Sequence, residues 1–256
     1  MHHRFLSLLF LALIATASSQ AAAKPDHVFL LIGQSNMVGR APLKPEDRKV
    51  IPGCLLWNGK NWEPAQPGFN RYSKHQKPGS TQGMNGGPSF VAAYQKANPG
   101  VTVGIVCWAR GGTSIEQWHP DHLQPYDLYR EATKQAHAAL QKGGKLKGIL
   151  WHQGEANSGR ADRYPKLLQA HVARLRKEFN NPALPFVFGQ IGPWNKDYRA
   201  FNKMIPLQAA KIPHSACVLT KGLTNFDPYH FDRESQIKLG RRYAAKMLAL
   251  LKRDSQ

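Results

Sequence analysis

A serine, an aspartate and a histidine in this sequence stand where a hydrolase could use them. Ser35 lies in the segment GQSNM, directly after an apolar run, and Asp227 and His230 are three residues apart in a later turn-rich segment. A serine hydroxyl becomes a nucleophile when a histidine takes its proton and an acid orients that histidine. Taken alone, a serine after a strand is more often a helix N-cap. The pattern therefore predicts nucleophilic catalysis only if distant segments bring these side chains together.

Two other polar segments also follow apolar runs. Residues 109–114 read ARGGTS, and residues 151–155 read WHQGE, with an amide in Gln153 and a carboxylate in Glu155. A glycine pair can leave backbone N–H groups exposed, and such groups stabilise the oxyanion of acyl transfer. Ligands of open parallel sheets bind beyond the carboxyl ends of the strands. We therefore expect these segments to meet the serine and the histidine around one cleft.

Several neighbouring residues are candidates for supporting roles. We expect Asn36 to brace the serine turn by side-chain hydrogen bonds. Glu155 is expected to tie loop amides together, with a triad acid or a substrate contact as alternatives. His152 either lines the cleft or packs behind Gln153, and Arg110 either binds a substrate oxygen or forms a structural salt bridge.

Nearby aromatic and acidic residues can each be interpreted in two ways. Trp118 and His119 could form a wall against which a sugar stacks, although a buried tryptophan is the commoner case. Asp232 is a second carboxylate close to His230, and we expect it to cap the last helix.

The elements that must position these residues alternate along the chain. Short runs that are apolar throughout predict buried strands at residues 27–32, 101–108, 146–151, 185–191 and 216–220. Amphipathic stretches predict helices at residues 88–97, 128–142, 162–179, 198–210 and 234–252. This alternation is typical of a parallel sheet covered on both faces. Residues 40–80, rich in proline and glycine, are expected to form a long irregular insertion.

Composition and charge exclude some classes and leave others open. The chain has 256 residues, of which 42% are hydrophobic, and this excludes a wholly disordered, collagenous or coiled-coil protein. The formal net charge of +19 favours an acidic glycan or an anionic cell surface as partner, or simply reflects a basic exported protein. No nucleic-acid-binding motif accompanies it. The oligomeric state stays open.

Cysteine usage and ligand spacing predict no metal and no other cofactor. The three cysteines are Cys54, Cys107 and Cys217, and the last two lie in predicted strands, where a buried cysteine behaves as a small hydrophobic residue. No pair of cysteines or histidines has the spacing of a zinc site.

The N-terminal segment has the pattern of a secretory signal peptide. A short basic start precedes an apolar run at residues 5–15, and small residues follow as far as Ala23. The run is shorter than the roughly 20 residues that a spanning helix needs. We expect residues 1–23 to be removed, residues 24–256 to form a single domain without a membrane span, and the product to be secreted or periplasmic.

Four motif blocks carry a resemblance to a known family. The blocks are GQSNM, GGTSI, HQGE and Asp-x-x-His-Phe, in that order between residues 33 and 231. They resemble those of the SGNH-hydrolase superfamily, and more narrowly those of sialate O-acetylesterases and family 6 acetylxylan esterases. The resemblance implies a flavodoxin-like three-layer α/β/α sandwich with a five-stranded parallel sheet. It also implies metal-free deacetylation through an acetyl-enzyme.

The same resemblance implies roles for single residues. Ser35 becomes the nucleophile, His230 the base and Asp227 its orienting acid. The backbone N–H groups of Ser35 and Gly112, together with the side-chain amide of Gln153, become the oxyanion hole.

These observations predict a secreted serine esterase that removes O-acetyl groups from carbohydrate. Acetylxylan-type polysaccharide is the leading substrate class, and O-acetylated sialic acid is second. The alternatives are a lipase or thioesterase on the same scaffold and a non-catalytic carbohydrate-binding protein.

Overall fold

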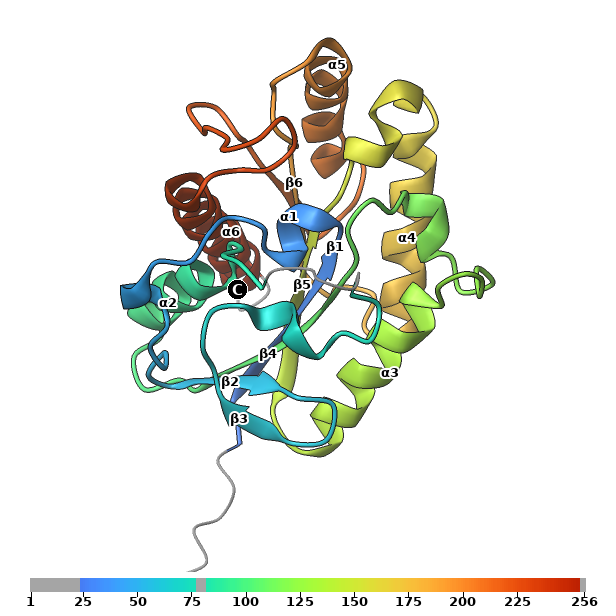
Figure 1. The fold of residues 1–256 in the computed structure, drawn as a ribbon. Helices are drawn as coiled ribbons and strands as arrows, with labels where there is room; N and C mark the ends of the chain where they lie inside the picture. The colour runs from blue at the N-terminus through green and yellow to red at the C-terminus, as the bar shows by residue number, and fades with distance from the viewer. Residues whose placement is uncertain (1–23, 77–81, 254–256) are drawn as a thin grey trace, which may run out of the picture.

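A mostly parallel β-sheet forms the centre of the protein. The computed structural model describes residues 24–76 and 82–253. Within this part of the chain the sheet has seven strands in the order β3-β2-β4-β1-β5-β6-β7 (Figure 1). The strands are β1 His27–Gly33, β2 Cys54–Trp57, β3 Trp62–Pro64, β4 Val103–Ala109, β5 Lys145–His152, β6 Phe186–Gly189 and β7 Ser215–Val218. All neighbouring pairs are parallel except β2 and β3.

The predicted α/β class is confirmed, but the predicted count of five strands is wrong. The five expected strands are β1, β4, β5, β6 and β7, and their order in the sheet is that of flavodoxin-like folds. The two additional strands lie in residues 40–80, which we expected to be irregular. β2 extends the sheet beside β4, and β3 folds back on it through a turn in which Asn58 Oδ1 accepts from the backbone N–H of Lys60 and Asn61.

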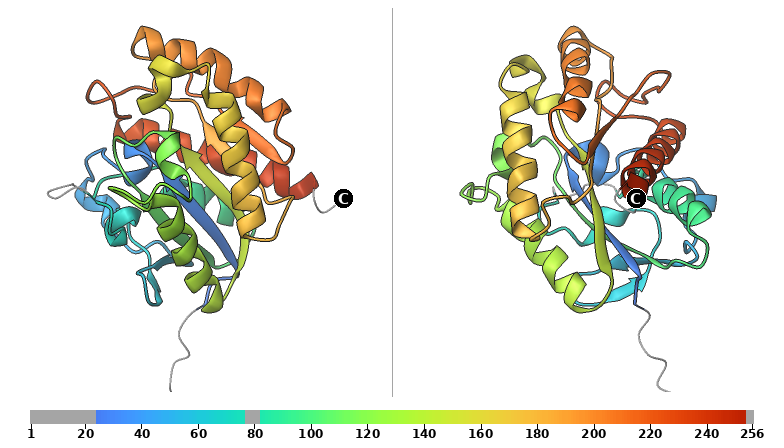
Figure 2. Two further views of the ribbon diagram at one scale, coloured as in Figure 1. Left: turned by 90° about the vertical axis from the view of Figure 1, so that its right-hand side faces the viewer. Right: turned by 180° about the vertical axis from the view of Figure 1, so that it is seen from behind.

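Helices cover both faces of this sheet. Figure 2 shows the two layers from further sides, with α2 and α6 on one face and α3 and α4 on the other. The helices are α1 Ser35–Val38, α2 Gly87–Ala97, α3 Leu128–Gln141, α4 Tyr164–Glu178, α5 Lys196–Met204 and α6 Arg233–Arg253. Short 3₁₀ helices are η1 Pro45–Asp47, η2 Phe69–Tyr72, η3 Ile115–Trp118, η4 Glu155–Arg160 and η5 Ile205–Ala210. The helix predicted at residues 198–210 is thus divided into α5 and η5.

The central strand β1 is buried on both sides. Its side chains alternate between two hydrophobic clusters, with Val28, Leu30 and Ile32 in one and Phe29 and Leu31 in the other. Burying each such side chain contributes about 1.5–3 kcal/mol. The strand that leads to Ser35 is therefore held in place by packing on both of its faces.

Cysteine burial and membrane topology add two observations. Cys54, Cys107 and Cys217 are all buried and unpaired with one another. Among the described residues, every helix is too short or too polar to cross a bilayer. The predicted signal peptide at residues 1–23 lies outside the described residues.

Candidate active site

Ser35 lies at the junction between β1 and α1. The preceding Gly33 has a φ of +140°, and a Cβ atom there would clash with the carbonyl oxygen of His152, which accepts a 2.9 Å hydrogen bond from the N–H of Gln34. Only glycine permits this close approach of β1, which ends at Gly33, and β5, which ends at His152. Ser35 itself is the first residue of α1, so its own N–H has no partner within the helix. The sharp turn therefore directs the serine to the edge of the sheet.

A cavity of about 320 Å³ opens at this edge. It is bordered by the serine turn, the loop after β4, the loop after β5, the start of α5 and the loop before α6. Its lining residues are Gln34, Ser35, Arg40, Gly111, Gly112, Glu155, Ala156, Tyr198, Tyr229 and His230. Ser35 and His230 are separated by nearly 200 residues in sequence, and the fold places both at one cavity.

The loop before α6 holds the histidine and the aspartate as a hydrogen-bonded pair. His230 Nδ1 lies 2.6 Å from Asp227 Oδ2, and Asp227 Oδ1 accepts from the backbone N–H groups of Tyr229 and His230 at 2.8 Å each. Burial acts to raise the pKa of Asp227, but the hydrogen bonds from His230 and from the Tyr229 N–H outweigh it, and the pKa is lowered. The aspartate therefore stays ionised and fixes the ring through Nδ1, which leaves Nε2 for the cavity.

The serine and the histidine border the same cavity. No hydrogen bond joins their side chains in the described part of the chain. Serine–histidine hydrogen bonds of this kind often tighten only when substrate binds. The arrangement is compatible with proton transfer between the two.

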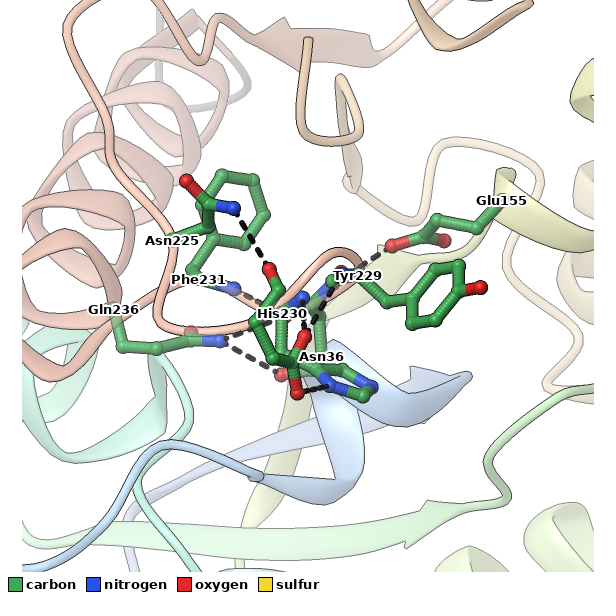
Figure 3. A network of polar contacts seen from close by, with 8 residues as sticks. Asn36, Glu155, Asn225, Tyr229, His230, Phe231 and Gln236 are labelled. Atoms are coloured by element: carbon green, nitrogen blue, oxygen red, sulfur yellow. Dashed lines mark hydrogen bonds and ion pairs between the residues drawn. The ribbon is translucent and has the colours of Figure 1, made fainter. Parts of the chain in front are cut away.

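Asn36 connects the turn that carries Ser35 to residues 219–232, the loop between β7 and α6, which we call the histidine loop. Its Nδ2 donates to Glu155 Oε1 at 2.7 Å and to the carbonyl oxygen of Tyr229 at 3.2 Å. Its Oδ1 accepts from the N–H of Phe231 at 3.1 Å and from Gln236 Nε2 at 3.3 Å. Asn36 therefore holds the turn after β1 against Glu155 and against the segment around His230, as Figure 3 shows.

Two of the predicted oxyanion donors are backbone N–H groups of residues at the cavity. Among the described residues the N–H groups of Ser35 and Gly112 make no backbone hydrogen bond, and Gly112 has a φ of +74°. Both residues line the cavity.

The third predicted donor, Gln153, is differently placed. Its side chain is 1% exposed and does not line the cavity. Its Nε2 donates to Asn157 Oδ1 at 2.7 Å, and Gln34 Oε1 and the Thr113 carbonyl oxygen each lie 3.1 Å away. Two N–H groups thus serve three acceptors, and the amide would reach an oxyanion only by giving up one of these bonds.

Two more predicted residues lie behind the site. His152 is buried, its Nδ1 lies 3.0 Å from Tyr243 Oη, and burial lowers its pKa to about 4. Arg110 donates to the carbonyl oxygen of His75 and to Tyr126 Oη, and its guanidinium carbon lies 3.5 Å from the centroid of the Tyr126 ring. Neither residue lines the cavity, so His152 packs behind it and Arg110 fixes surrounding loops.

The remaining candidate residues lie partly at the cavity and partly away from it. Glu155 lines the cavity, whereas Trp118 is buried in the core against Trp151 and forms no sugar-facing wall. Asp232 caps α6, because its Oδ1 accepts from the N–H of Ser235 at 2.8 Å. Residues 24–76 and 82–253 contain no group of three or more side chains suited to hold a metal ion.

Four cavity residues were not anticipated from the sequence: Arg40, Ala156, Tyr198 and Tyr229. Tyr229 lies between the aspartate and the histidine, so its position in the motif was a usable signal. Arg40 and Tyr198 reach the cavity from the end of the serine turn and from α5, and no pattern in the sequence marks them.

Comparison with known proteins places this chain among carbohydrate esterases. A family model described as carbohydrate esterase, sialic acid-specific acetylesterase, matches residues 25–249. A probable carbohydrate esterase from Arabidopsis thaliana is 27% identical over 243 residues, which cover 86% of this chain and 90% of that protein.

Solved structures give the same fold. The X-ray structure of the Arabidopsis protein matches with a TM-score of 0.77 at 25% identity, over 88% of this chain and 98% of that one. A carbohydrate acetylesterase from Xanthomonas citri matches with a TM-score of 0.62 at 19% identity, over 90% of this chain and 57% of that one. A family 3 carbohydrate esterase from Clostridium thermocellum matches with a TM-score of 0.54 at 9% identity, over 90% and 98%. At these identities the last two similarities concern the fold alone.

Proposed function

Because the chain belongs to the carbohydrate esterase family of sialic acid-specific acetylesterases, we propose that Ser35, His230 and Asp227 carry its deacetylation of carbohydrate. Membership makes the protein a carboxylic ester hydrolase with acetylated carbohydrate as its substrate class. The observation that carries the proposed triad is the shared cavity of Ser35 and His230, with Asp227 bound to the opposite nitrogen of the ring.

The proposed reaction proceeds in two acyl-transfer steps. His230 Nε2 takes the proton of Ser35 Oγ as the oxygen attacks the acetyl carbonyl carbon. The N–H groups of Ser35 and Gly112 stabilise the oxyanion, and loss of one such donor typically costs about 10²–10³ in rate. The ester C–O bond then breaks, and His230 returns the proton to the departing sugar hydroxyl. Water activated by His230 attacks the acetyl-enzyme, which releases acetate and regenerates the serine.

Among substrates we propose acetylated polysaccharide of the acetylxylan type, with O-acetylated sialic acid second. The cavity of about 320 Å³ is bordered by charged and polar side chains, including Arg40 and Glu155, which suits a short acyl group on a sugar better than a long acyl chain. A chain-length series of nitrophenyl esters tests this: we expect acetate to be preferred, and preference for octanoate would instead indicate a lipase or thioesterase. Acetate release from a panel of acetylated glycans identifies the sugar.

The triad is tested by the Ser35→Ala variant. We expect deacetylation to fall by about 10⁴-fold or more, with an unchanged thermal unfolding midpoint, because only one oxygen atom is removed. Full hydrolysis of an acetyl ester by the folded variant would overturn the assignment.

We also propose that the protein is exported after removal of residues 1–23. The proposal rests on the signal-like pattern of that segment. Mass spectrometry of the protein from the native host tests it: an N-terminus near residue 24 supports export, and an intact cytoplasmic chain contradicts it.

A further inference from the structure

The walls of the cavity differ in chemistry. On the side of Gly111 and Gly112, backbone groups and Arg40 lie close to Ser35, since a Cβ atom on Gly111 would come within 3.0 Å of Arg40 Nη2 and 3.4 Å of Ser35 Cβ. The other wall, which we call the aromatic wall, consists of Glu155, Tyr198 and Tyr229. The first side is close to the proposed oxyanion donors, so the aromatic wall is left for the rest of the substrate.

Only one of the two carboxylate oxygens of Glu155 has a hydrogen-bond partner among the described residues. Oε1 accepts from Asn36 Nδ2 at 2.7 Å, whereas Oε2 is buried and has no hydrogen-bond partner among the described residues. A buried polar atom without a partner is costly and calls for an explanation. Burial also raises the pKa of Glu155 to about 7 from its usual 4.5, against the lowering effects of its own backbone N–H group, of the Asn36 hydrogen bond and of the Gly154 N–H group. In either protonation state, Oε2 can form a hydrogen bond with a hydroxyl group.

The two tyrosines of the aromatic wall supply ring surface beside this oxygen. Tyr229 is 56% exposed and lines the cavity together with Glu155. Tyr198 is buried, and burial together with the nearby charges of Glu155 and Tyr229 raises its pKa to about 12.

Exposed rings are concentrated at this site. The described residues contain six exposed large hydrophobic side chains, and the two aromatic ones, Phe226 and Tyr229, both lie on the histidine loop. Sugar rings present apolar C–H faces and a rim of hydroxyl groups. An aromatic surface next to a carboxylate oxygen matches both features.

We propose that the aromatic wall binds the sugar ring of the acetylated substrate, with Tyr229 against its C–H face and Glu155 Oε2 hydrogen-bonded to one of its hydroxyl groups. This inference rests on the proposed deacetylation and adds the orientation of the substrate. The acetyl group lies toward Gly112, and the sugar lies toward Glu155.

The two partners of a single hydrogen bond provide the test. Glu155→Met breaks this hydrogen bond and also removes Oε2, with little change in the length of the side chain. Asn36→Ala breaks the same hydrogen bond and leaves Oε2 in place. The measurement is kcat/KM for a monoacetylated methyl β-xylopyranoside divided by kcat/KM for 4-nitrophenyl acetate, which has no sugar.

We expect Glu155→Met to lower this ratio about tenfold, the size of effect typical of one lost substrate hydrogen bond. Asn36→Ala should lower both rates together and leave the ratio within about twofold, because Asn36 acts through the histidine loop. Equal changes of the ratio in the two variants would overturn the proposal, since Glu155 would then act only through Asn36.

Tyr229 gives a second test that does not depend on folding of the Glu155 variant. Tyr229→Ala should lower the ratio about tenfold, and Tyr229→Phe, which keeps the ring, should retain most of it. An unchanged ratio in Tyr229→Ala would overturn the stacking contact. Failure of the proposed function is separately visible, because wild-type protein would then hydrolyse neither ester or Ser35→Ala would retain activity.

Discussion

The two sides of the active site are built in different ways. Ser35 is 7% exposed and follows a strand whose residues Val28 to Leu31 are completely buried. His230 lies on a loop whose neighbouring side chains Phe226 and Tyr229 are 44% and 56% exposed. The sheet holds the first side, whereas a few polar contacts and the buried ring of Phe231 hold the second.

Because of this difference, we expect substitutions on one side to affect stability and substitutions on the other side to affect activity. Changes on the sheet side disturb a packed interior, and their cost appears in the free energy of unfolding. Changes on the loop side disturb hydrogen bonds that orient one imidazole ring, and their cost appears in the reaction rate. The predictions below test this division.

The largest effect is expected for Asp227→Asn on the loop side. The amide cannot stabilise the imidazolium that forms when His230 takes the serine proton, so kcat should fall by about 10⁴-fold. The unfolding midpoint should hardly change, because Asp227 is on an exposed loop. Steady-state kinetics and thermal unfolding measure both. A loss of less than tenfold would assign the orienting acid to another residue.

Gly33→Ala is the matching change on the sheet side. The new methyl group would clash with the His152 carbonyl oxygen at a φ of +140°, so the free energy of unfolding should fall by about 3 kcal/mol or more. Urea unfolding measures it. The same substitution at Gly222, which has a φ of +73° and open space around its Cβ position, controls for the backbone conformation and should cost less. Equal costs would mean that the close approach of β1 and β5 is unimportant.

The smallest of these effects concerns acid stability of the packed side. His171 is buried among Trp118, Trp151 and Phe186, neither of its ring nitrogens has a hydrogen-bond partner in the described residues, and burial lowers its pKa to about 3. The unfolded chain binds a proton near pH 6.5 and the folded protein does not. The free energy of unfolding should therefore decrease as the pH falls below about 6.5, and between pH 6 and pH 5 this residue should lower it by about 1 kcal/mol.

His171→Phe removes this contribution and keeps an aromatic ring. Urea unfolding of both proteins at pH 6 and pH 5 should give a shallower pH dependence for the variant. Parallel curves would show that His171 is protonated equally in the folded and unfolded states.

Much of the fold was predictable because five strands are continuous apolar runs. β1, β4, β5, β6 and β7 all coincide with such runs, which indicate burial on both faces of a parallel sheet. β2 and β3 were missed because they have only four and three residues and lie in a segment rich in proline and glycine. Strands this short become regular through pairing with β4, which local sequence does not report.

The site was predictable as a set of segments, but the roles of single side chains were less so. The short spacing between Asp227 and His230 indicated their pairing, because residues on one turn can reach each other. The engagement of Gln153 with three acceptors, and the link from Asn36 to a loop almost 200 residues away, depend on how loops pack. Tyr198 enters the cavity only because α5 packs above the sheet edge, and no local pattern encodes that placement.

The central claim is that His230 activates Ser35, and labelling by an organophosphonate tests it most directly. Such a probe reacts with a serine only when a base has activated the hydroxyl. Peptide mass spectrometry should locate one phosphonyl group on Ser35 in the wild-type protein, and in His230→Ala labelling should be slower by about 10³-fold or more. Labelling of a different serine, or labelling of Ser35 at an unchanged rate in His230→Ala, would contradict the account.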